Sequence, residues 1–254
     1  MQITGNTILI TGGGSGIGRA LAEVFHAQGN QVIITGRRKE ALDNTTAANP
    51  GMKSLVLDVE DSASIRSFGT QVATDYPTLN VLINNAGIMR TEDVHQQDDL
   101  ADAEATVTTN LLGPIRLTAA LLPLLKQQPH STIMTVSSGL AFVPMTATPT
   151  YCATKAAIHS YTQSLRHQLK ETTVEVLELI PPYVQTELMG EAQASDPNAM
   201  PLEDFIAEVL EILKTQPTAS EVCVKTVHPL RFAVESGHYD DVFKGLNDRA
   251  AATH

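Results

Sequence analysis

The chain of 254 residues carries 17 basic and 28 acidic residues, and its formal net charge is −11 at pH 7. This length suits one large α/β domain, and so acidic a chain is a poor candidate for nonspecific binding to nucleic acid. Its two cysteines, Cys152 and Cys223, give neither a disulfide framework nor metal-ligand spacing. The first residues lack a signal-peptide pattern and no stretch reaches roughly 18 apolar residues, so we expect a cytoplasmic protein with no membrane partner.

Short apolar runs alternate with longer helical patterns along the chain. The expected strands cover residues 7–11, 31–35, 54–58, 81–84, 132–138, 174–180 and 221–227. Helical patterns lie at 16–29, 37–48, 62–76, about 100–126, the segment containing YCATK, and 202–216. This alternation of apolar strands and helices predicts a parallel sheet that is covered on both faces.

Right-handed crossovers then make the sheet doubly wound, so we expect a single α/β domain of the Rossmann type over residues 1–254, with seven parallel strands. The polar, proline-containing stretch at 187–201 predicts a mobile loop within this domain. We therefore expect a substrate loop around 183–215 and a C-terminal tail at 228–254.

The stretch ITGGGSGIGRA lies between the first strand and the first helix. Gly12, Gly16 and Gly18 permit positive φ and a close approach of a ligand to the backbone. The helix N-terminus that follows presents free N–H groups to a phosphate. A tight turn without a ligand is the alternative, but the position after the first strand of an α/β chain favours a nucleotide site.

A basic pair, Arg37 and Arg38, follows the second strand. Sites for NAD often have an acidic residue here, about 20 residues after the glycines, to bind the ribose hydroxyls. A guanidinium pair suits the 2′-phosphate of NADP, whereas a carboxylate would repel it. The alternative is a solvated basic pair at a helix start. The pair favours NADP(H), with NAD(H) possible.

Four motifs together resemble the short-chain dehydrogenase/reductase family over roughly residues 5–230: TGGGSGIG, NNAG (84–87), the second serine of VSSG, and the Y-x-x-x-K of YCATK. The details SSGLAF, YCATKAA, LRHQL and PP are most similar to the DltE-type oxidoreductases of that family. The resemblance implies hydride transfer between a nicotinamide cofactor and a carbonyl or alcohol. It also implies a catalytic tetrad: Asn110, Ser138, Tyr151 and Lys155.

The same resemblance implies a set of cofactor contacts. Asp58 and Val59 match positions beside the adenine, the NNAG turn lies along the adenosine ribose, and Thr186 holds the nicotinamide carboxamide. The expected cofactor-binding residues are Gly12, Ser15, Gly16, Ile17, Gly18, Arg37, Arg38, Asp58, Val59, Asn84, Ala86, Gly87, Tyr151, Lys155, Pro181, Val184 and Thr186. One departure is Pro182, where the family often has glycine; proline fixes φ and removes a donor, so the nicotinamide loop is expected to follow a different path.

Tyr151 can give a proton to the alkoxide that forms when a carbonyl receives hydride, and tyrosinate can remove it in reverse. Because a free phenol titrates near pH ~10, a nearby cation is needed to bring its pKa toward neutrality. Lys155 lies four residues later, on the same helix face. Ser138 can polarise the substrate carbonyl. The family implies that Asn110 completes a proton path to Lys155 through water.

The substrate pocket is expected from two apolar segments, one after Ser138 and one after the sixth strand. Its residues would be Leu140, Phe142, Met145, Tyr183, Leu188 and Met189. We expect a small ketone or alcohol with a hydrophobic side and, by resemblance, a homodimer or homotetramer. The eight histidines show no H-x-x-x-H pair or carboxylate cluster, so we expect no metal.

Other functions stay open beside the oxidoreductase hypothesis. The chain could be a catalytically silent, cofactor-binding regulatory protein, although intact Ser138, Tyr151 and Lys155 argue against that. It could also catalyse epimerisation or dehydration on the same scaffold, since fold alone does not choose between reactions. A serine hydrolase is disfavoured because SSG lacks the G-x-S-x-G elbow.

Overall fold

The computed structural model describes residues 1–96 and 99–252, so the last two residues of the expected 228–254 tail, with His254, lie outside it. Seven strands form one sheet in the order β3-β2-β1-β4-β5-β6-β7, and every neighbouring pair is parallel. They are β1 (Thr7–Thr11), β2 (Gln31–Gly36), β3 (Lys53–Val56), β4 (Val81–Asn84), β5 (Ser131–Val136), β6 (Val174–Ile180) and β7 (Glu221–Cys223). The predicted doubly wound, seven-stranded parallel sheet is therefore confirmed.

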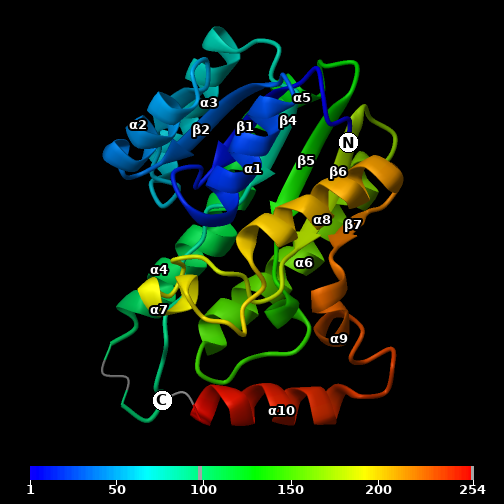
Figure 1. Cartoon of the computed structure of the whole chain (residues 1–254). Helices are drawn as coiled ribbons and strands as arrows, with labels where there is room; N and C mark the ends of the chain where they lie inside the picture. Colours follow the sequence, from blue (N-terminus) through cyan, green and yellow to red (C-terminus); the bar gives the residue numbers. More distant parts are fainter. Residues whose placement is uncertain (97–98, 253–254) are drawn as a thin grey trace.

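Helices cover both faces of this sheet (Figure 1). They are α1 (Gly16–Ala27), α2 (Lys39–Ala48), α3 (Ser62–Asp75), α4 (Ala101–Val107), α5 (Gly113–Leu125), α6 (Pro149–Leu169), α7 (Glu191–Ala194), α8 (Leu202–Thr215), α9 (His228–Arg231) and α10 (Tyr239–Ala252). Short turns of other helix types are η1 (Thr108–Leu112), η2 (Gly139–Ala141) and η3 (Lys225–Val227). None of the helices in the described ranges is long and apolar enough to cross a bilayer.

The strand side chains alternate between two hydrophobic cores. Ile8 and Ile10 of β1 join the core that α1, α2 and α8 cover, whereas Leu9 joins the core under α3, α5 and α6. All five residues of β1 are buried, as expected for a central strand with helices on each side. Because helices cover both faces of the sheet, a site can form only at the ends of its strands. The loops at the carboxyl ends of the strands are the candidates.

The predicted continuous helix at about 100–126 is interrupted. A single π-helical turn, η1, separates α4 from α5 and contains Asn110. The Asn110 amide is turned into the protein, where its Oδ1 accepts from the Ile88 N–H at 2.9 Å and its Nδ2 donates to the Ile88 carbonyl at 2.8 Å. These bonds to a distant segment account for the widened turn, and such turns often occur at functional sites.

The segment predicted as a substrate loop, residues 183–215, has two parts in the structure. Its second part is α8, whose Phe205 and Val209 are fully buried in the core against α1. Only the stretch between β6 and α8 is free to border a site. The tail after β7 forms α9 and α10, and Figure 1 shows α10 as the red helix lying away from the sheet. Asn247 attaches α10 to the loop before α6, accepting from the Thr146 N–H at 2.7 Å.

Candidate active site

A cleft of about 460 Å³ opens at the carboxyl ends of the strands. Segments that follow β1, β2, β3, β4, β5 and β6 line it, so residues far apart in sequence meet there. The strand order reverses direction at β1, with β2 on one side and β4 on the other. Ligands of open α/β sheets bind in the crevice at such a switch point.

The glycine turn after β1 forms one wall of the cleft. Gly12 and Gly16 have φ values of +68° and +51°, a region that glycine enters without steric cost. A Cβ on Gly18 would lie 2.4 Å from the Gly12 carbonyl oxygen, so a side chain does not fit there. The Ser15 side chain makes no cap bond to α1, which leaves the N–H groups of the first helical turn open to a ligand.

The NNAG turn after β4 is tied to the end of β1. The Thr11 hydroxyl oxygen accepts from the N–H groups of Asn85 and Ala86, at 3.0 and 2.9 Å. Asn84 lies differently from its expected place, because its amide is buried and donates to Thr118 of α5 at 3.1 Å. Asn85, Ala86 and Gly87 border the cleft, so the second asparagine of NNAG is a cleft residue that sequence reasoning missed.

The basic pair after β2 borders the cleft, but each arginine already has a partner. Arg37 pairs with Glu60 at 2.7 Å, and Arg38 donates to the Ser15 hydroxyl oxygen at 3.3 Å. Glu60 was not expected at the site, and it lies only two residues from Asp58 in the sequence. Asp58 itself accepts the Glu60 N–H at 3.0 Å and shapes this turn, whereas Val59 borders the cleft.

Ser138, Tyr151 and Lys155 are brought together on the opposite wall, and each is at least nine-tenths buried. Ser138 follows β5, while Tyr151 and Lys155 stand one turn apart on α6. The Lys155 ammonium lies 5.5 Å from the centre of the Tyr151 ring and donates to the Val136 carbonyl at 2.8 Å. A hydroxyl, a phenol and an ammonium therefore converge beside the cleft.

The pKa of Tyr151 corrects one sequence expectation. We expected Lys155 to draw the phenol pKa down toward neutrality, but burial raises the pKa of Tyr151 to about 12, although a hydrogen bond with Ser138 lowers it. Burial also lowers the pKa of Lys155 to about 8, against the opposing effect of the Glu178 carboxylate. Both groups are pushed toward their neutral forms because a dry pocket disfavours charge. At neutral pH, the phenol is a proton donor.

Asn110 lies behind this wall. Besides its two bonds to Ile88, its amide donates to the Thr154 hydroxyl at 3.3 Å. It therefore joins η1 to α6 and to the segment after β4, next to the cleft lining residue Ile88.

The expected substrate pocket is only partly formed by the residues proposed for it. Leu188 borders the cleft, but the Phe142 ring turns away and packs edge-on against His159, with centroids 4.7 Å apart. Tyr183 and Met189 are partly exposed outside the cleft lining, and the Tyr183 hydroxyl donates to Asp196 at 3.1 Å. The other two expected residues, Leu140 and Met145, are half-buried outside the cleft lining. Ile88, Met89 and Val184 are among the apolar residues that line the cleft together with Leu188.

The Pro181–Pro182 loop keeps Thr186 at the cleft. Pro181 and Pro182 both border the cleft, and the Pro181 carbonyl accepts the Gly139 N–H at 2.9 Å. Gln193 of α7 then holds the loop by donating to the Val184 carbonyl at 2.8 Å and to the Thr186 hydroxyl oxygen at 3.1 Å. This glutamine was missed because its role depends on contacts across the loop.

With this site in view, the sequence can be compared with known proteins. The profile described as "short chain dehydrogenase" matches residues 6–197, so the chain belongs to the short chain dehydrogenase family and is an oxidoreductase of that family. The predicted resemblance is thereby confirmed.

Two kinds of relative are similar to this chain. The uncharacterized oxidoreductase DltE of Bacillus subtilis (strain 168) is 38% identical over 251 residues, which cover 97% of this chain and 98% of the relative. A short chain dehydrogenase structure from Burkholderia cenocepacia J2315 in complex with NADP has a TM-score of 0.83 at 24% identity, covering 97% of this chain and 99% of the other. Another from Sphingobium yanoikuyae in complex with NADPH has a TM-score of 0.78 at 25% identity, covering 94% and 95%.

Proposed function

We propose that this protein is an NADP(H)-dependent oxidoreductase that interconverts a ketone or aldehyde with an alcohol, with Tyr151 as general acid and base. The observation that carries the proposal is the convergence of Ser138, Tyr151 and Lys155 on a cleft that also contains the glycine turn and the first turn of α1. A proton donor and a nucleotide-binding turn on one cleft are what carbonyl reduction requires.

The cleft fits a nicotinamide dinucleotide. The Gly12–Gly18 turn lets a diphosphate approach the backbone, and the unused N–H groups of α1 favour its charge. Arg38 and Arg37 would receive the 2′-phosphate, with Arg37 exchanging Glu60 for that phosphate. The NADP and NADPH complexes of the two similar structures support this choice, and NAD(H) remains a second cofactor.

A nicotinamide cofactor held in the cleft would supply or accept the hydride, and the protein would supply or accept the proton. Tyr151, whose pKa is raised to about 12 by burial, holds its proton at neutral pH and donates it to the oxygen of the reduced carbonyl. Lys155 stabilises the resulting tyrosinate, and Ser138 orients the carbonyl oxygen. A phenol that is protonated at neutral pH is in the form that proton donation to a carbonyl oxygen needs.

The catalytic proposal is tested with Tyr151→Phe. We expect the rate of NADPH-dependent carbonyl reduction to fall at least ~100-fold, because general acid catalysis contributes that much or more. NADPH binding, followed by fluorescence, should persist. Tyr161→Phe is the matched control, since Tyr161 lies on the same helix and outside the cleft lining. Near-normal turnover by Tyr151→Phe would refute the proposal.

The cofactor proposal is tested by titration with NADPH and NADH. We expect tighter binding of NADPH, and a loss of ~10-fold or more of that preference in Arg38→Ala, because a guanidinium–phosphate pair is removed. Arg37→Ala should lose less, since Glu60 already neutralises Arg37. Arg19→Ala is the control, because Arg19 pairs with Glu23 on α1 outside the cleft lining. Equal affinity for both cofactors in the unmodified protein would contradict the proposal.

We also propose the substrate class, the assembly and the compartment. Ile88, Met89 and Leu188 at the cleft support a ketone or alcohol with a hydrophobic side, which a panel of alkyl, aryl and charged carbonyl compounds tests. Turnover of charged hydroxy acids alone would contradict it. The family resemblance supports a homodimer or homotetramer, so light scattering should report a species above 27.3 kDa. Two unpaired cysteines are in keeping with a cytoplasmic protein.

A further inference from the structure

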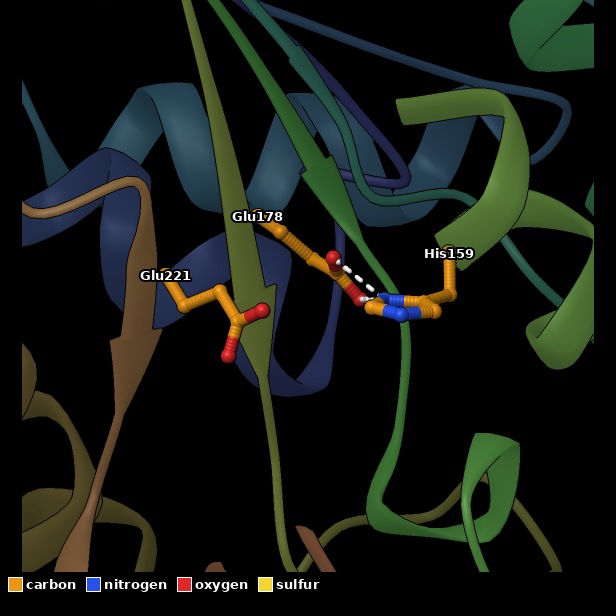
Figure 2. A group of neighbouring side chains, drawn as sticks. All are labelled: His159, Glu178 and Glu221. Atoms are coloured by element: carbon orange, nitrogen blue, oxygen red, sulfur yellow. Dashed lines mark hydrogen bonds and ion pairs between the residues drawn. The ribbon is translucent and has the colours of Figure 1, made fainter. Parts of the chain in front are cut away.

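His159, Glu178 and Glu221 meet on the α6 side of the sheet, one helical turn beyond Lys155 (Figure 2). Their ligand-type atoms all lie within 4.8 Å of one another. No local sequence pattern indicates this cluster, because its members come from α6, β6 and β7. Glu178 is fully buried in the middle of β6, and both of its carboxylate oxygens contact the His159 Nδ1, at 2.8 and 3.0 Å.

The carboxylate oxygens of this cluster are already engaged by side chains of the protein. Glu221 is the register partner of Glu178 on β7, and its two oxygens accept from Arg231 at 2.7 and 3.0 Å. An arginine fork and an imidazole N–H thus occupy the oxygens that a cation would need. Glu221 therefore has its own counter-charge.

The counter-charge of Glu178 is less complete. Its partner nitrogen, His159 Nδ1, must carry a proton to donate to a carboxylate. The other ring nitrogen, Nε2, lies 3.0 Å from the Gln163 amide nitrogen, which donates to it. Glu178 thus has an imidazole as its partner in a fully buried position, whereas Glu221 has a guanidinium.

Lys155 is the buried cation adjacent to this charge. It precedes His159 by one turn on α6, and its ammonium donates to the carbonyl of Val136. Val136 follows Thr135 on β5, and Thr135 is the register partner of Glu178. The ammonium and the carboxylate therefore lie under the same helix, over neighbouring strands of the same sheet face.

We propose that Glu178, fixed by His159, is a positioning residue that keeps Lys155 charged and so sets the upper pH limit of the Tyr151–Lys155 pair. The proposal rests on the proposed function of that pair. An opposite charge nearby favours the ionised form of a buried group. Consistent with this, burial lowers the pKa of Lys155 and Glu178 raises it. His159 fixes the position of the Glu178 carboxylate, because both carboxylate oxygens contact its Nδ1.

Two arginines and a cysteine are other ionisable groups near Glu178, and hydrogen bonds hold both arginines elsewhere. On α6, Arg166 donates to the carbonyls of Val176 and Ser220, at 2.9 and 3.0 Å. On α9, Arg231 is committed to Glu221 and to Glu235. On β7, burial raises the pKa of the Cys223 thiol to about 11, which keeps it neutral in the working range.

The test measures the charge of Lys155 directly. In the full-length protein labelled with 13C at lysine Cε, the Lys155 signal is assigned with Lys155→Met and followed from neutral to alkaline pH. We expect Glu178→Gln to lower its midpoint by ~0.5 pH unit or more. Glu175→Gln is the matched control, since Glu175 lies on the same strand beside Met1 and Thr132. Its midpoint should change by less than ~0.2 pH unit, because it is paired and partly exposed.

An unchanged Lys155 midpoint in folded Glu178→Gln would overturn the proposal. If that variant does not fold, the double variant Glu178→Leu with His159→Leu removes both polar partners together, which buried pairs often tolerate. The double variant should show the same lowered Lys155 midpoint. A Lys155 midpoint like that of the unmodified protein would also overturn the proposal.

A second readout connects the charge to catalysis. In Glu178→Gln, the alkaline limb of NADPH-dependent turnover should move to lower pH by the same amount as the Lys155 midpoint. A shifted midpoint with an unshifted limb would overturn the catalytic role. Because the 13C titration needs no turnover, failure of the proposed function would leave that measurement intact and would be recognised separately.

Discussion

Lys155 is a buried ammonium whose charge destabilises the fold. Its pKa in the folded protein, about 8, lies below the ordinary value of 10.5, because burial disfavours its charge. The folded state thus binds fewer protons than the unfolded state between these two values, and the free energy of unfolding rises with pH across that window. Below about pH 8 the charged lysine opposes folding in full.

Replacing this lysine should therefore stabilise the protein while abolishing its activity. We expect Lys155→Met to raise the melting temperature by ~3 °C or more at pH 7, and the gain should shrink as the pH approaches 10. Differential scanning calorimetry at the two pH values measures both effects. Lys126→Met, at an exposed position, should change little. A lower melting temperature for Lys155→Met at pH 7 would contradict the buried-charge argument.

Gly18 is required by close packing and not by its φ angle. A Cβ there would clash with backbone, 2.4 Å from the Gly12 oxygen, and with the Asn85 amide at 2.3 Å. We expect Gly18→Ala to lower the free energy of unfolding by ~1–3 kcal/mol and to weaken dinucleotide binding, because the turn must move to make room. Urea unfolding and NADPH titration test this.

Gly245→Ala on α10 is the matched substitution, since a Cβ at Gly245 makes only an ordinary contact. It should leave the free energy of unfolding unchanged or slightly higher, because alanine is the better helix former. Equal stability of the two variants would show that the turn around Gly18 can relax.

At the scale of elements, the π turn η1 connects the segment after β4 to α6. Its Asn110 holds the backbone of Ile88 and the hydroxyl of Thr154. Thr154 is on α6, between Tyr151 and Lys155. The turn thus positions α6 relative to the NNAG segment, without Asn110 bordering the cleft.

Removing that amide should loosen both neighbours. We expect Asn110→Ala to cost about 2–3 kcal/mol in the free energy of unfolding, because buried backbone groups of Ile88 lose their partners. Hydrogen exchange at Ile88 should rise in parallel. Asn198→Ala removes a surface amide that bonds Asp196, and should cost less than ~0.5 kcal/mol. No change in exchange at Ile88 would indicate that η1 is held by other contacts.

Elements with a strong local pattern were predictable from the sequence. The apolar runs gave six strands within two residues of their ends, and they gave the position of the seventh, which stops earlier because residues 225–227 turn into η3. The π turn was not predictable, because it depends on the backbone of Ile88, which is distant in sequence.

The site likewise contains residues that local motifs indicate and residues that only the fold brings together. Ser138, Tyr151 and Lys155 were found from short motifs whose spacing is local. The Phe142 contact with His159, the pairing of Arg37 with Glu60, and the burial of Glu178 all join distant segments, so no local pattern indicates them. The pKa of Tyr151 was misjudged for a related reason, since it depends on how completely the folded chain excludes water.

At the scale of the whole molecule, the cleft is formed by loops from six strands on both sides of the switch point. A ligand that binds only this folded arrangement stabilises it by mass action. We expect NADPH at 100 times its dissociation constant to add about 2.7 kcal/mol to the free energy of unfolding, seen as a higher melting temperature. NADH at the same concentration should add less. An equal shift by both would contradict the NADP(H) preference.

The strand order also affects how the protein is made. β1 pairs with β4, where Ile8 lies opposite Val81. The ribosome adds Val81 about 70 residues after Ile8, which takes roughly 4–14 s at usual rates. During those seconds one edge of β1, whose three central residues are apolar, has no partner, and such an edge attracts other chains. The nascent chain is therefore most exposed to aggregation before its fourth strand emerges, and its yield should depend on chaperones that bind early in synthesis.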